Sequence, residues 1–195
     1  VPVITAASGE PLEIILARAE EMTADVFVYG EDFSADMIFP AGGGQRVAFH
    51  SLVCREPAPF ELSLAGTYQA ENAALVIMAA KLLERDDARI TEEALRTALA
   101  HVRHPARFEI RSWAAGDAVV DGAHNPAGMA ALRASLDRYF PKEQRVFVLG
   151  ILKDKDIDTM LSILLRPGDV VVTVRPNSER AAGADVVAAV AAAMG

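Results

Sequence analysis

The residues DGAHNP, at positions 121–126, place chemically versatile side chains between a predicted strand and a predicted helix. Asp121 ends an apolar run, and Pro126 suits the first turn of a helix. Such a loop presents backbone N–H groups and the positive end of the helix dipole to an anion. Asp121 can accept hydrogen bonds from ribose hydroxyls, while His124 and Asn125 offer polar groups and a stacking surface to a base. Alternatively, Asp121 and Asn125 only cap the loop and the helix, and His124 packs.

Arg107 is the second candidate for chemistry. It stands two residues after Pro105, in the segment HVRHPARFEI at positions 101–110. An arginine at a hinge between domains can reach a phosphate and present a bidentate guanidinium to it. The commoner role of an arginine is an ion pair, either across the domains or with a residue such as Glu109. The residues alone leave both interpretations open.

A further polar loop, GILKDKD at positions 150–156, also carries cations. Lys153 or Lys155 could lie near a phosphate, whereas Asp156 is better placed to cap the helix that follows. No HExxH or similar carboxylate–histidine spacing indicates a metal site in this chain.

The elements that position these loops alternate in the second half of the chain. Continuous apolar strands are predicted at 118–122, 145–150 and 169–174, and helices at 126–140, 156–165 and 184–194. This alternation predicts a parallel sheet covered on both faces. If the strands are parallel, the loops 121–126, 150–156 and 174–180 share the sheet edge at which ligands bind.

The first half of the chain has a different pattern. A helix is predicted over 12–22 and a strand over 26–29. A hairpin-like excursion is predicted from the glycine turn at 41–44 and the strand-like stretches 46–53 and 59–64. Two helices, 66–85 and 91–102, close this half, and Thr91 is the predicted N-cap of the second. We place a domain boundary here, between residues 1–103 and 104–195.

Composition limits the classes of function. The 195 residues carry 19 Lys and Arg against 27 Asp and Glu, a net charge of −8, which argues against general binding to nucleic acid or anionic membranes. The single cysteine, Cys54, allows no intrachain disulfide. The sequence shows no secretory signal and no apolar run of about 20 residues, so a cytoplasmic protein is expected. The phosphate-binding patterns G-x-x-x-x-G-K-[ST] and G-x-G-x-x-G do not occur.

Four segments in order resemble a known family: LAGTYQAENAALVIMAA (64–80), HPARFE (104–109), DGAHNP (121–126) and VFVLGILKDKD (146–156). They are similar to the ATP-dependent Mur ligase superfamily and, within it, to folylpolyglutamate synthases, including the bifunctional dihydrofolate synthases. The resemblance implies an α/β fold in which residues 1–103 end a P-loop-type central ATPase domain. Residues 104–195 would form a Rossmann-like, mostly parallel-sheet C-terminal domain. Both domains would be incomplete, in keeping with ends at Val1 and Gly195 that look like cuts through a longer protein.

The resemblance also implies a reaction. Family members bind ATP, phosphorylate a substrate carboxylate and let the amino group of glutamate displace phosphate. Arg107 would reach the ATP phosphates and stabilise the acyl phosphate, while Asp121 and His124 would approach the ribose and base with Asn125 in support. The expected substrates are ATP, L-glutamate and folate or dihydropteroate, and the protein is expected to be a monomer. The P-loop and the Mg²⁺ ligands are expected N-terminal to Val1, so the chain alone is expected to be inactive.

Two residues depart from the family pattern. Tyr68 stands where the family usually has His, which puts the roles of Gln69 and Asn72 in doubt, and Ala106 stands where it usually has Gly. Two alternatives remain at this stage. One is a cell-wall Mur ligase that acts on UDP-muramyl substrates, and the other is a non-catalytic nucleotide-binding or interaction domain.

Overall fold

The computed structural model describes residues 1–41, 44–53, 59–114, 116–141 and 144–194. Cys54 and the centre of the predicted glycine turn lie outside the described residues. The chain forms two compact units, Val1–Val120 and Asp121–Gly195. The chain is α/β in both units, as predicted.

The first unit begins with a strand, a helix and a second strand. β1 (Val3–Thr5) and β2 (Val26–Val28) pair in parallel, with Val3 opposite Val26, and α1 (Glu10–Glu21) connects them. The predicted helix and second strand are confirmed, whereas the short β1 was not predicted.

A three-stranded antiparallel sheet follows in the order β3–β4–β5. Its strands are β3 (Phe33–Ala41), β4 (Gly44–Ser51) and β5 (Phe60–Leu62). The two predicted strand-like stretches are confirmed, because they pair antiparallel as β4 and β5. β3, which was not predicted, pairs antiparallel along the other edge of β4. Side chains alternate along β4, so that Val47 and Phe49 are buried.

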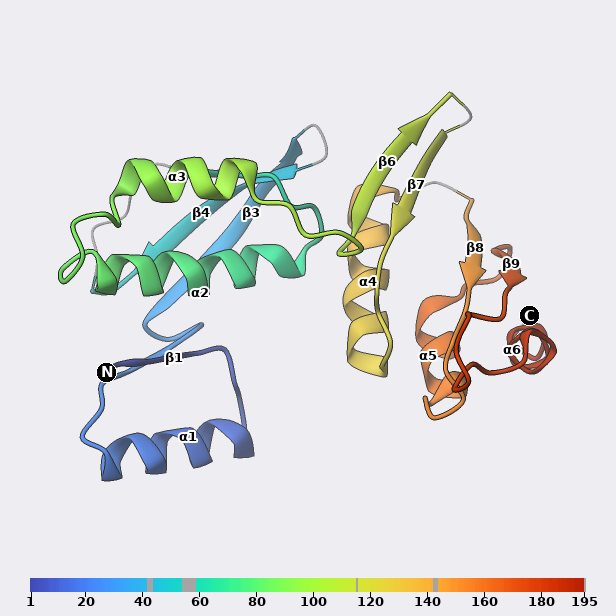
Figure 1. The fold of residues 1–195 in the computed structure, drawn as a ribbon, viewed down its shortest axis with the longest axis horizontal. Coiled ribbons are helices and arrows are strands. Elements are labelled where there is room, and N and C mark those ends of the chain that lie inside the picture. The colour runs from blue at the N-terminus through green and yellow to red at the C-terminus, as the bar shows by residue number, and fades with distance from the viewer. Residues whose placement is uncertain (42–43, 54–58, 115, 142–143, 195) are drawn as a thin grey trace. The chain divides into compact units, whose positions relative to one another are not determined.

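Two helices cover this sheet, α2 (Tyr68–Leu83) and α3 (Glu92–His101), as Figure 1 shows. The apolar side of α2 packs into one core with the sheet and α3, formed by Phe33, Ala35, Val47, Phe49, Phe60, Leu62, Ala70, Ala73, Ala74, Ile77, Met78, Leu95 and Leu99. Both helices were predicted. The predicted cap at Thr91 is confirmed, because its hydroxyl accepts a hydrogen bond from the Ala94 N–H at 3.1 Å.

The first unit ends in a β-hairpin. β6 (Glu109–Trp113) pairs antiparallel with β7 (Gly116–Val120). β7 corresponds to the strand predicted at 118–122, and β6 was not predicted. The expectation that this strand begins a parallel sheet is therefore wrong, since its partner among the described residues is antiparallel.

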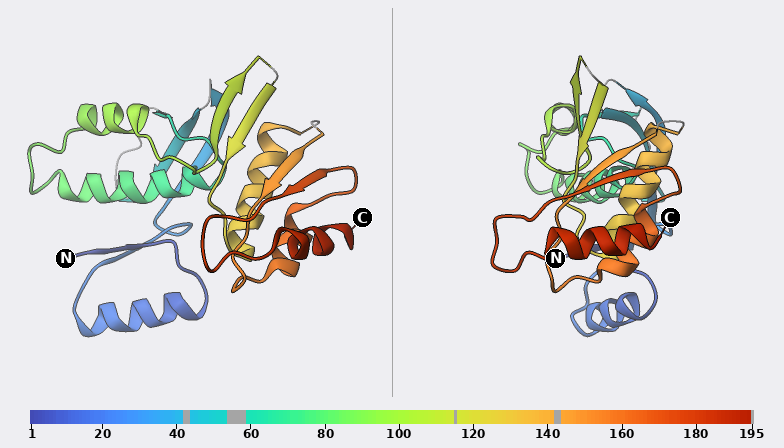
Figure 2. Two further views of the ribbon diagram at one scale, coloured as in Figure 1. Left: turned by 45° about the vertical axis from the view of Figure 1, so that its right-hand side comes forward. Right: turned by 90° about the vertical axis from the view of Figure 1, so that its right-hand side faces the viewer.

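The second unit has the predicted alternation of helices and strands. Its elements are α4 (Pro126–Tyr139), β8 (Val146–Leu149), α5 (Ile157–Leu164), β9 (Val170–Thr173) and α6 (Ala184–Ala192). β8 and β9 are parallel, with Val146 opposite Val170. Figure 2 shows α6 beside β9. The helices bury their apolar residues, among them Met129, Leu136, Met160, Leu161, Leu164 and Val187.

No helix among the residues described above is long and apolar enough to cross a membrane.

Candidate functional site

Arg107 lies in a short segment with an unusual backbone. Its neighbours Ala106 and Phe108 have φ angles of 56° and 47°, in the left-handed region that residues with a Cβ rarely adopt. Phe108 is completely buried, whereas Arg107 is exposed. The backbone therefore directs Phe108 into the first unit and the neighbouring guanidinium into solvent.

Phe108 packs against the turn that precedes α2. Gly66 has a φ of 104°, and a Cβ at this position would lie 3.1 Å from both Phe108 Cβ and Tyr68 Cε1. The Nε2 group of Gln45 donates hydrogen bonds to the carbonyls of Leu64 (3.1 Å) and Gly66 (2.8 Å). The Gly66 turn is thus fixed from inside the unit and leaves room for the aromatic side chain.

Glu109 does not pair with Arg107, contrary to one of the two interpretations of that arginine. Its carboxylate accepts the Ala106 N–H at 3.1 Å through Oε2, and Arg111 Nε at 3.0 Å through Oε1. These contacts hold the pKa of Glu109 below its ordinary value, the Ala106 N–H contributing most and Arg111 next. No hydrogen bond or ion pair of the Arg107 side chain occurs within the described ranges, so its guanidinium is available there to a ligand.

The loop 121–125 is organised by hydrogen bonds between near neighbours. Oδ1 of the half-buried Asp121 accepts the Ala123 N–H at 2.7 Å. Nδ1 of His124 lies 2.9 Å from the Gly122 carbonyl, which can only accept, so Nδ1 carries the proton and Nε2 is an acceptor in the neutral ring. The His124 ring is exposed and does not pack into the core.

Asn125 is the N-cap of α4. Its Oδ1 accepts the Gly128 N–H at 2.7 Å, and Pro126 follows in the first turn. The capping geometry foreseen for Asp121 and Asn125 is thus present. The cap uses Oδ1, the one side-chain oxygen of Asn125. Within the residues that the structure describes, its Nδ2 group makes no hydrogen bond and can donate to a ligand. The roles of these residues in binding ATP stay predictions.

The two loops that follow β8 and β9 meet at one sheet edge, since these strands are parallel. Leu152 forms a bridge with Ala181, and Arg180 pairs with Asp154 at 2.6 Å. The arginine lowers the pKa of Asp154. Asp156 caps α5 by accepting the Thr159 N–H at 3.1 Å, as predicted. As expected, these two loops lie at the same edge of a parallel pair of strands. The loop 121–126 was expected there only if the strand before it were also part of a parallel sheet, and that strand, β7, pairs antiparallel with β6.

The side chains of Gln69 and Asn72 lie in the first turns of α2. Asn72 Nδ2 donates to Oε1 of the buried Gln69 at 3.0 Å. Both line a hollow of about 180 Å³, which is otherwise apolar and is walled by Leu62, Leu64, Ala73, Val76, Leu95, Ala98, Leu99 and Val102. One hydrogen bond therefore joins the two polar side chains in the lining of an apolar hollow.

In the part of the chain that the structure describes, no group of three or more His, Cys, Asp or Glu side chains could hold a metal ion. Mg²⁺ therefore finds no fitting set of His, Cys, Asp or Glu there, and no chemical step below is assigned to it.

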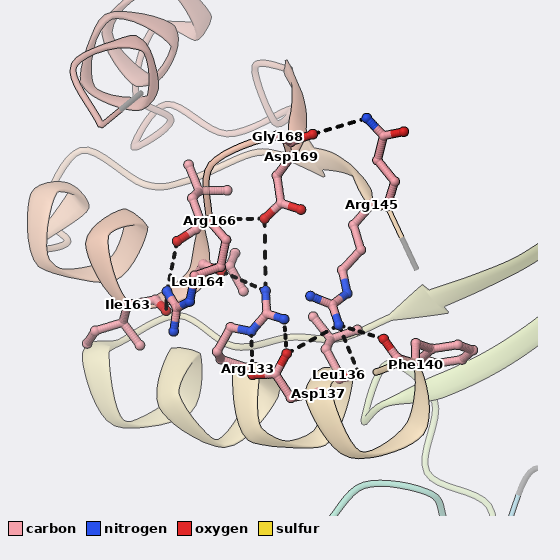
Figure 3. A network of polar contacts seen from close by, with 12 residues as sticks. Arg133, Leu136, Asp137, Phe140, Arg145, Ile163, Leu164, Arg166, Gly168 and Asp169 are labelled. Atoms are coloured by element: carbon pink, nitrogen blue, oxygen red, sulfur yellow. Dashed lines mark hydrogen bonds and ion pairs between the residues drawn. The ribbon is translucent and has the colours of Figure 1, made fainter. Parts of the chain in front are cut away.

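An ionic network fixes α4, the helix that begins at Asn125 (Figure 3). The buried Arg133 contacts Asp137 through both Nε and Nη2, and its Nη1 donates to the Leu164 carbonyl at 3.2 Å and lies 3.9 Å from Asp169. Arg145 reaches the Phe140 carbonyl at 2.7 Å, near the end of the helix. Arg133 lowers the pKa of Asp137 through its hydrogen bond. The network ties the helix behind the loop to α5 and to the start of β9.

Several residues that shape the candidate site were not predicted. Gly66, Gln45 and Phe108 support Arg107 from positions distant in sequence, which periodicity does not reveal. Phe108 did carry a signal, because it is the only Phe, Tyr or Trp in the segment 101–109, which is rich in charged and titratable residues.

Comparison with known proteins identifies the class. Residues 106–195 match the family model described as Mur ligase, glutamate ligase domain. That stretch includes Arg107 and the loop 121–125. Residues 106–195 of the chain therefore belong to the Mur ligase family.

Within this family the chain is similar to folylpolyglutamate and dihydrofolate synthases, which confirms the resemblance of its motifs. The dihydrofolate synthase/folylpolyglutamate synthase of Mycobacterium tuberculosis is 32% identical over 179 residues, covering 91% of this chain and 36% of that protein. The structure of M. tuberculosis folylpolyglutamate synthase complexed with ADP matches with a TM-score of 0.84 and 30% identity, over 98% of this chain and 42% of that one. A folylpolyglutamate synthase complex with AMPPCP and folate matches with a TM-score of 0.78 and 29% identity, over 90% of this chain and 42% of that one. The chain thus spans well under half the length of these relatives.

Proposed function

We propose that the full-length protein is an ATP-dependent ligase that adds L-glutamate to folate or dihydropteroate. The observation that carries this proposal is the exposed guanidinium of Arg107, which has no partner among the described residues and lies in a segment anchored on both sides. The similarity to a folylpolyglutamate synthase complexed with ADP supports the choice of nucleotide. The AMPPCP–folate complex of another relative supports the choice of the second substrate.

The proposed reaction has two steps. A carboxylate oxygen of the folate substrate attacks the γ-phosphorus of ATP, and ADP leaves. The amino group of glutamate then attacks the acyl carbon, forms the amide bond, loses a proton and expels phosphate. Negative charge is concentrated on the transferred phosphoryl group in the first step and on the leaving phosphate in the second. A guanidinium at the position of Arg107 stabilises this charge in both steps.

The loop 121–125 is assigned to the nucleoside in this proposal. The Asp121 carboxylate, oriented by the Ala123 N–H, accepts hydrogen bonds from ribose hydroxyls. The exposed ring of His124 stacks on the base or accepts a hydrogen bond from it through Nε2, and Asn125 donates from Nδ2 while its Oδ1 caps the helix.

The domain assignment is part of the same proposal. Residues 1–103 would belong to the central ATPase-type domain and residues 104–195 to the glutamate ligase domain. The family match that begins at residue 106 supports the second assignment. The use of Mg²⁺, a monomeric state and a cytoplasmic location remain predictions.

An assay of substrate choice tests the proposed function. The full-length protein is incubated with MgATP, L-glutamate and, in parallel, tetrahydrofolate, dihydropteroate or a UDP-muramyl substrate, and the products are analysed by mass spectrometry. We expect a mass increase of one glutamyl residue, with release of ADP and phosphate, on one or both pteridine substrates. Product only from the UDP-muramyl substrate would assign the chain to a cell-wall ligase, and no ATP-dependent product at all would favour the non-catalytic alternative.

The chain of 195 residues provides a second test. We expect no ATP- and glutamate-dependent turnover by this chain alone, because it contains no phosphate-binding P-loop pattern. We also expect weak nucleotide binding that is reduced in Asp121→Ala. Turnover by the chain would contradict its proposed inactivity, and equal binding by Asp121→Ala would contradict the role of the loop.

A further inference from the structure

The turn that contains Arg107 has a backbone conformation that residues with a Cβ do not prefer. The residues before and after it, Ala106 and Phe108, both adopt left-handed φ angles, 56° and 47°. A free peptide of this sequence would favour other conformations, since a Cβ is crowded in the left-handed region. The turn therefore depends on contacts that hold its two ends.

The first anchor is apolar and long-range. Phe108 is completely buried, and its Cβ closely approaches the place where Gly66 lacks a side chain. Gln45, itself only 1% exposed, holds the Gly66 carbonyl through Nε2 at 2.8 Å. This anchor fixes the residue that follows Arg107.

The second anchor is polar and spans the turn. Glu109 Oε2 accepts the Ala106 N–H at 3.1 Å, so a side chain two residues after Arg107 holds the residue just before it. Arg111 pairs with the other carboxylate oxygen, Nη2 to Oε1 at 2.8 Å, and keeps the carboxylate in place. Arg107 and Phe108 lie between the two ends of this contact, and of the four residues 106–109 only Arg107 has a side chain that is both charged and exposed.

We propose that Glu109 is a positioning residue for Arg107. Its carboxylate closes the turn around Arg107 and so fixes the direction in which the guanidinium leaves the backbone. The proposal rests on the proposed function, in which Arg107 contacts the phosphates of ATP. A small displacement of a group that stabilises transition-state charge costs much of the rate, so loss of the anchor reduces catalysis even though Glu109 touches no substrate.

The test is a double-mutant cycle in the full-length protein, with kcat and the KM for ATP measured under ligation conditions. The variants are Glu109→Ala, Arg107→Ala and the two combined. Glu109→Gln keeps an oxygen that can accept the Ala106 N–H. Asp117→Ala is the matched control, because it removes a carboxylate of the same hairpin that accepts a hydrogen bond from the Ser112 hydroxyl and makes none with Ala106. Far-ultraviolet circular dichroism checks that each variant retains its fold.

We expect Glu109→Ala to lower kcat/KM for ATP about tenfold or more and Glu109→Gln to recover most of that loss. Asp117→Ala should stay within about twofold of the wild type. In the Arg107→Ala background, Glu109→Ala should have no further effect, because the group that it positions is gone.

Three results would overturn the proposal. Wild-type kinetics for Glu109→Ala would show that the anchor is dispensable. An equal fall in kcat/KM when Glu109→Ala is made in the wild type and in Arg107→Ala would show a general structural role that does not act through Arg107. Wild-type kinetics for Arg107→Ala would refute the role of Arg107 in the proposed function, and the positioning of that residue would fall with it.

Discussion

The two groups of candidate site residues are held in different ways. The turn around Arg107 depends on side chains far away in sequence, since Phe108 packs against Gly66 and Gln45 fixes that glycine. The loop 121–125 is held by contacts between residues two or three positions apart, at Asp121, His124 and Asn125.

The loop 121–125 owes its conformation to the local sequence, whereas the turn around Arg107 owes its conformation to the surrounding unit. Short-range hydrogen bonds of Asp, Asn and His are properties of the local sequence, and they form wherever a helix starts after such a loop. A left-handed backbone at Ala106 and Phe108 is not a local preference, and it persists only because the unit around it holds it. Substitutions should therefore have large effects on stability in the first group and small effects in the second.

Phe108→Ala is the most severe test of this comparison. The change removes a fully buried aromatic side chain and leaves a cavity beside Gly66, so we expect the first unit to lose about 3–5 kcal/mol of unfolding free energy. Urea unfolding followed by Trp113 fluorescence measures it, with the exposed Ile14→Ala as control. A loss below about 1 kcal/mol would show that the turn does not depend on this anchor.

Asp137→Ala tests whether the second unit has a long-range anchor of its own, away from its loop. The change leaves the buried Arg133 without its main partner, and only its contacts with the Leu164 carbonyl and Asp169 remain. We expect a loss of about 2 kcal/mol, below the range for fully buried pairs because Asp137 is half exposed. Hydrogen exchange of the α4 amides measures this loss, and Arg138→Ala, on the exposed side of the same helix, should change it by less than about 0.5 kcal/mol.

The same pair predicts a pH dependence. Arg133 lowers the pKa of Asp137 in the folded chain from its ordinary value of 3.8. The stabilisation is therefore complete above that ordinary value and is lost as the pH falls through the lowered pKa. The stability difference between wild type and Asp137→Ala should be unchanged from pH 6 to about pH 5 and should narrow as the pH falls further to about pH 2. A difference that stays constant over this range would contradict the assignment of the ion pair.

Asn125→Ala tests the locally held loop. Loss of the cap on the Gly128 N–H should cost about 1 kcal/mol, seen as faster hydrogen exchange in the first turn of α4. Asn125→Asp should retain the cap and the stability. If Asn125→Ala lost as much unfolding free energy as Phe108→Ala, the distinction between the turn around Arg107 and the loop 121–125 would be wrong.

Ala106→Gly has the smallest expected effect and the opposite sign. Glycine adopts a φ of 56° without strain, although it also gains freedom in the unfolded chain, so we expect a net stabilisation of about 0.5 kcal/mol. Thermal unfolding of the two chains measures it. A clear destabilisation would mean that the Ala106 backbone is not held in the left-handed region.

The same contrast explains what could be predicted from the sequence. Thr91, Asn125 and Asp156 act as caps where short-range patterns place them, and the helices and strands of the second unit follow their apolar runs. β3 was not predicted, although Phe33, Ala35 and Met37 alternate with polar residues as in a half-buried strand. Its pairing with β4 is the part that the pattern does not specify. The hairpin β6–β7 is local, with Trp113 opposite Gly116, and β6 was missed in spite of that. The packing of Phe108 on Gly66 joins residues far apart in sequence, and no pattern within one segment specifies it.

The central claim, that Arg107 stabilises the transferred phosphoryl group, is tested most directly by the steady-state rate of ATP- and glutamate-dependent ligation in Arg107→Ala of the full-length protein. Arg103→Ala is the control, since Arg103 is an exposed arginine four residues earlier. We expect kcat/KM to fall about 100-fold or more in Arg107→Ala and to stay within about twofold of the wild type in Arg103→Ala. Equal rates for Arg107→Ala and the wild type would contradict the account.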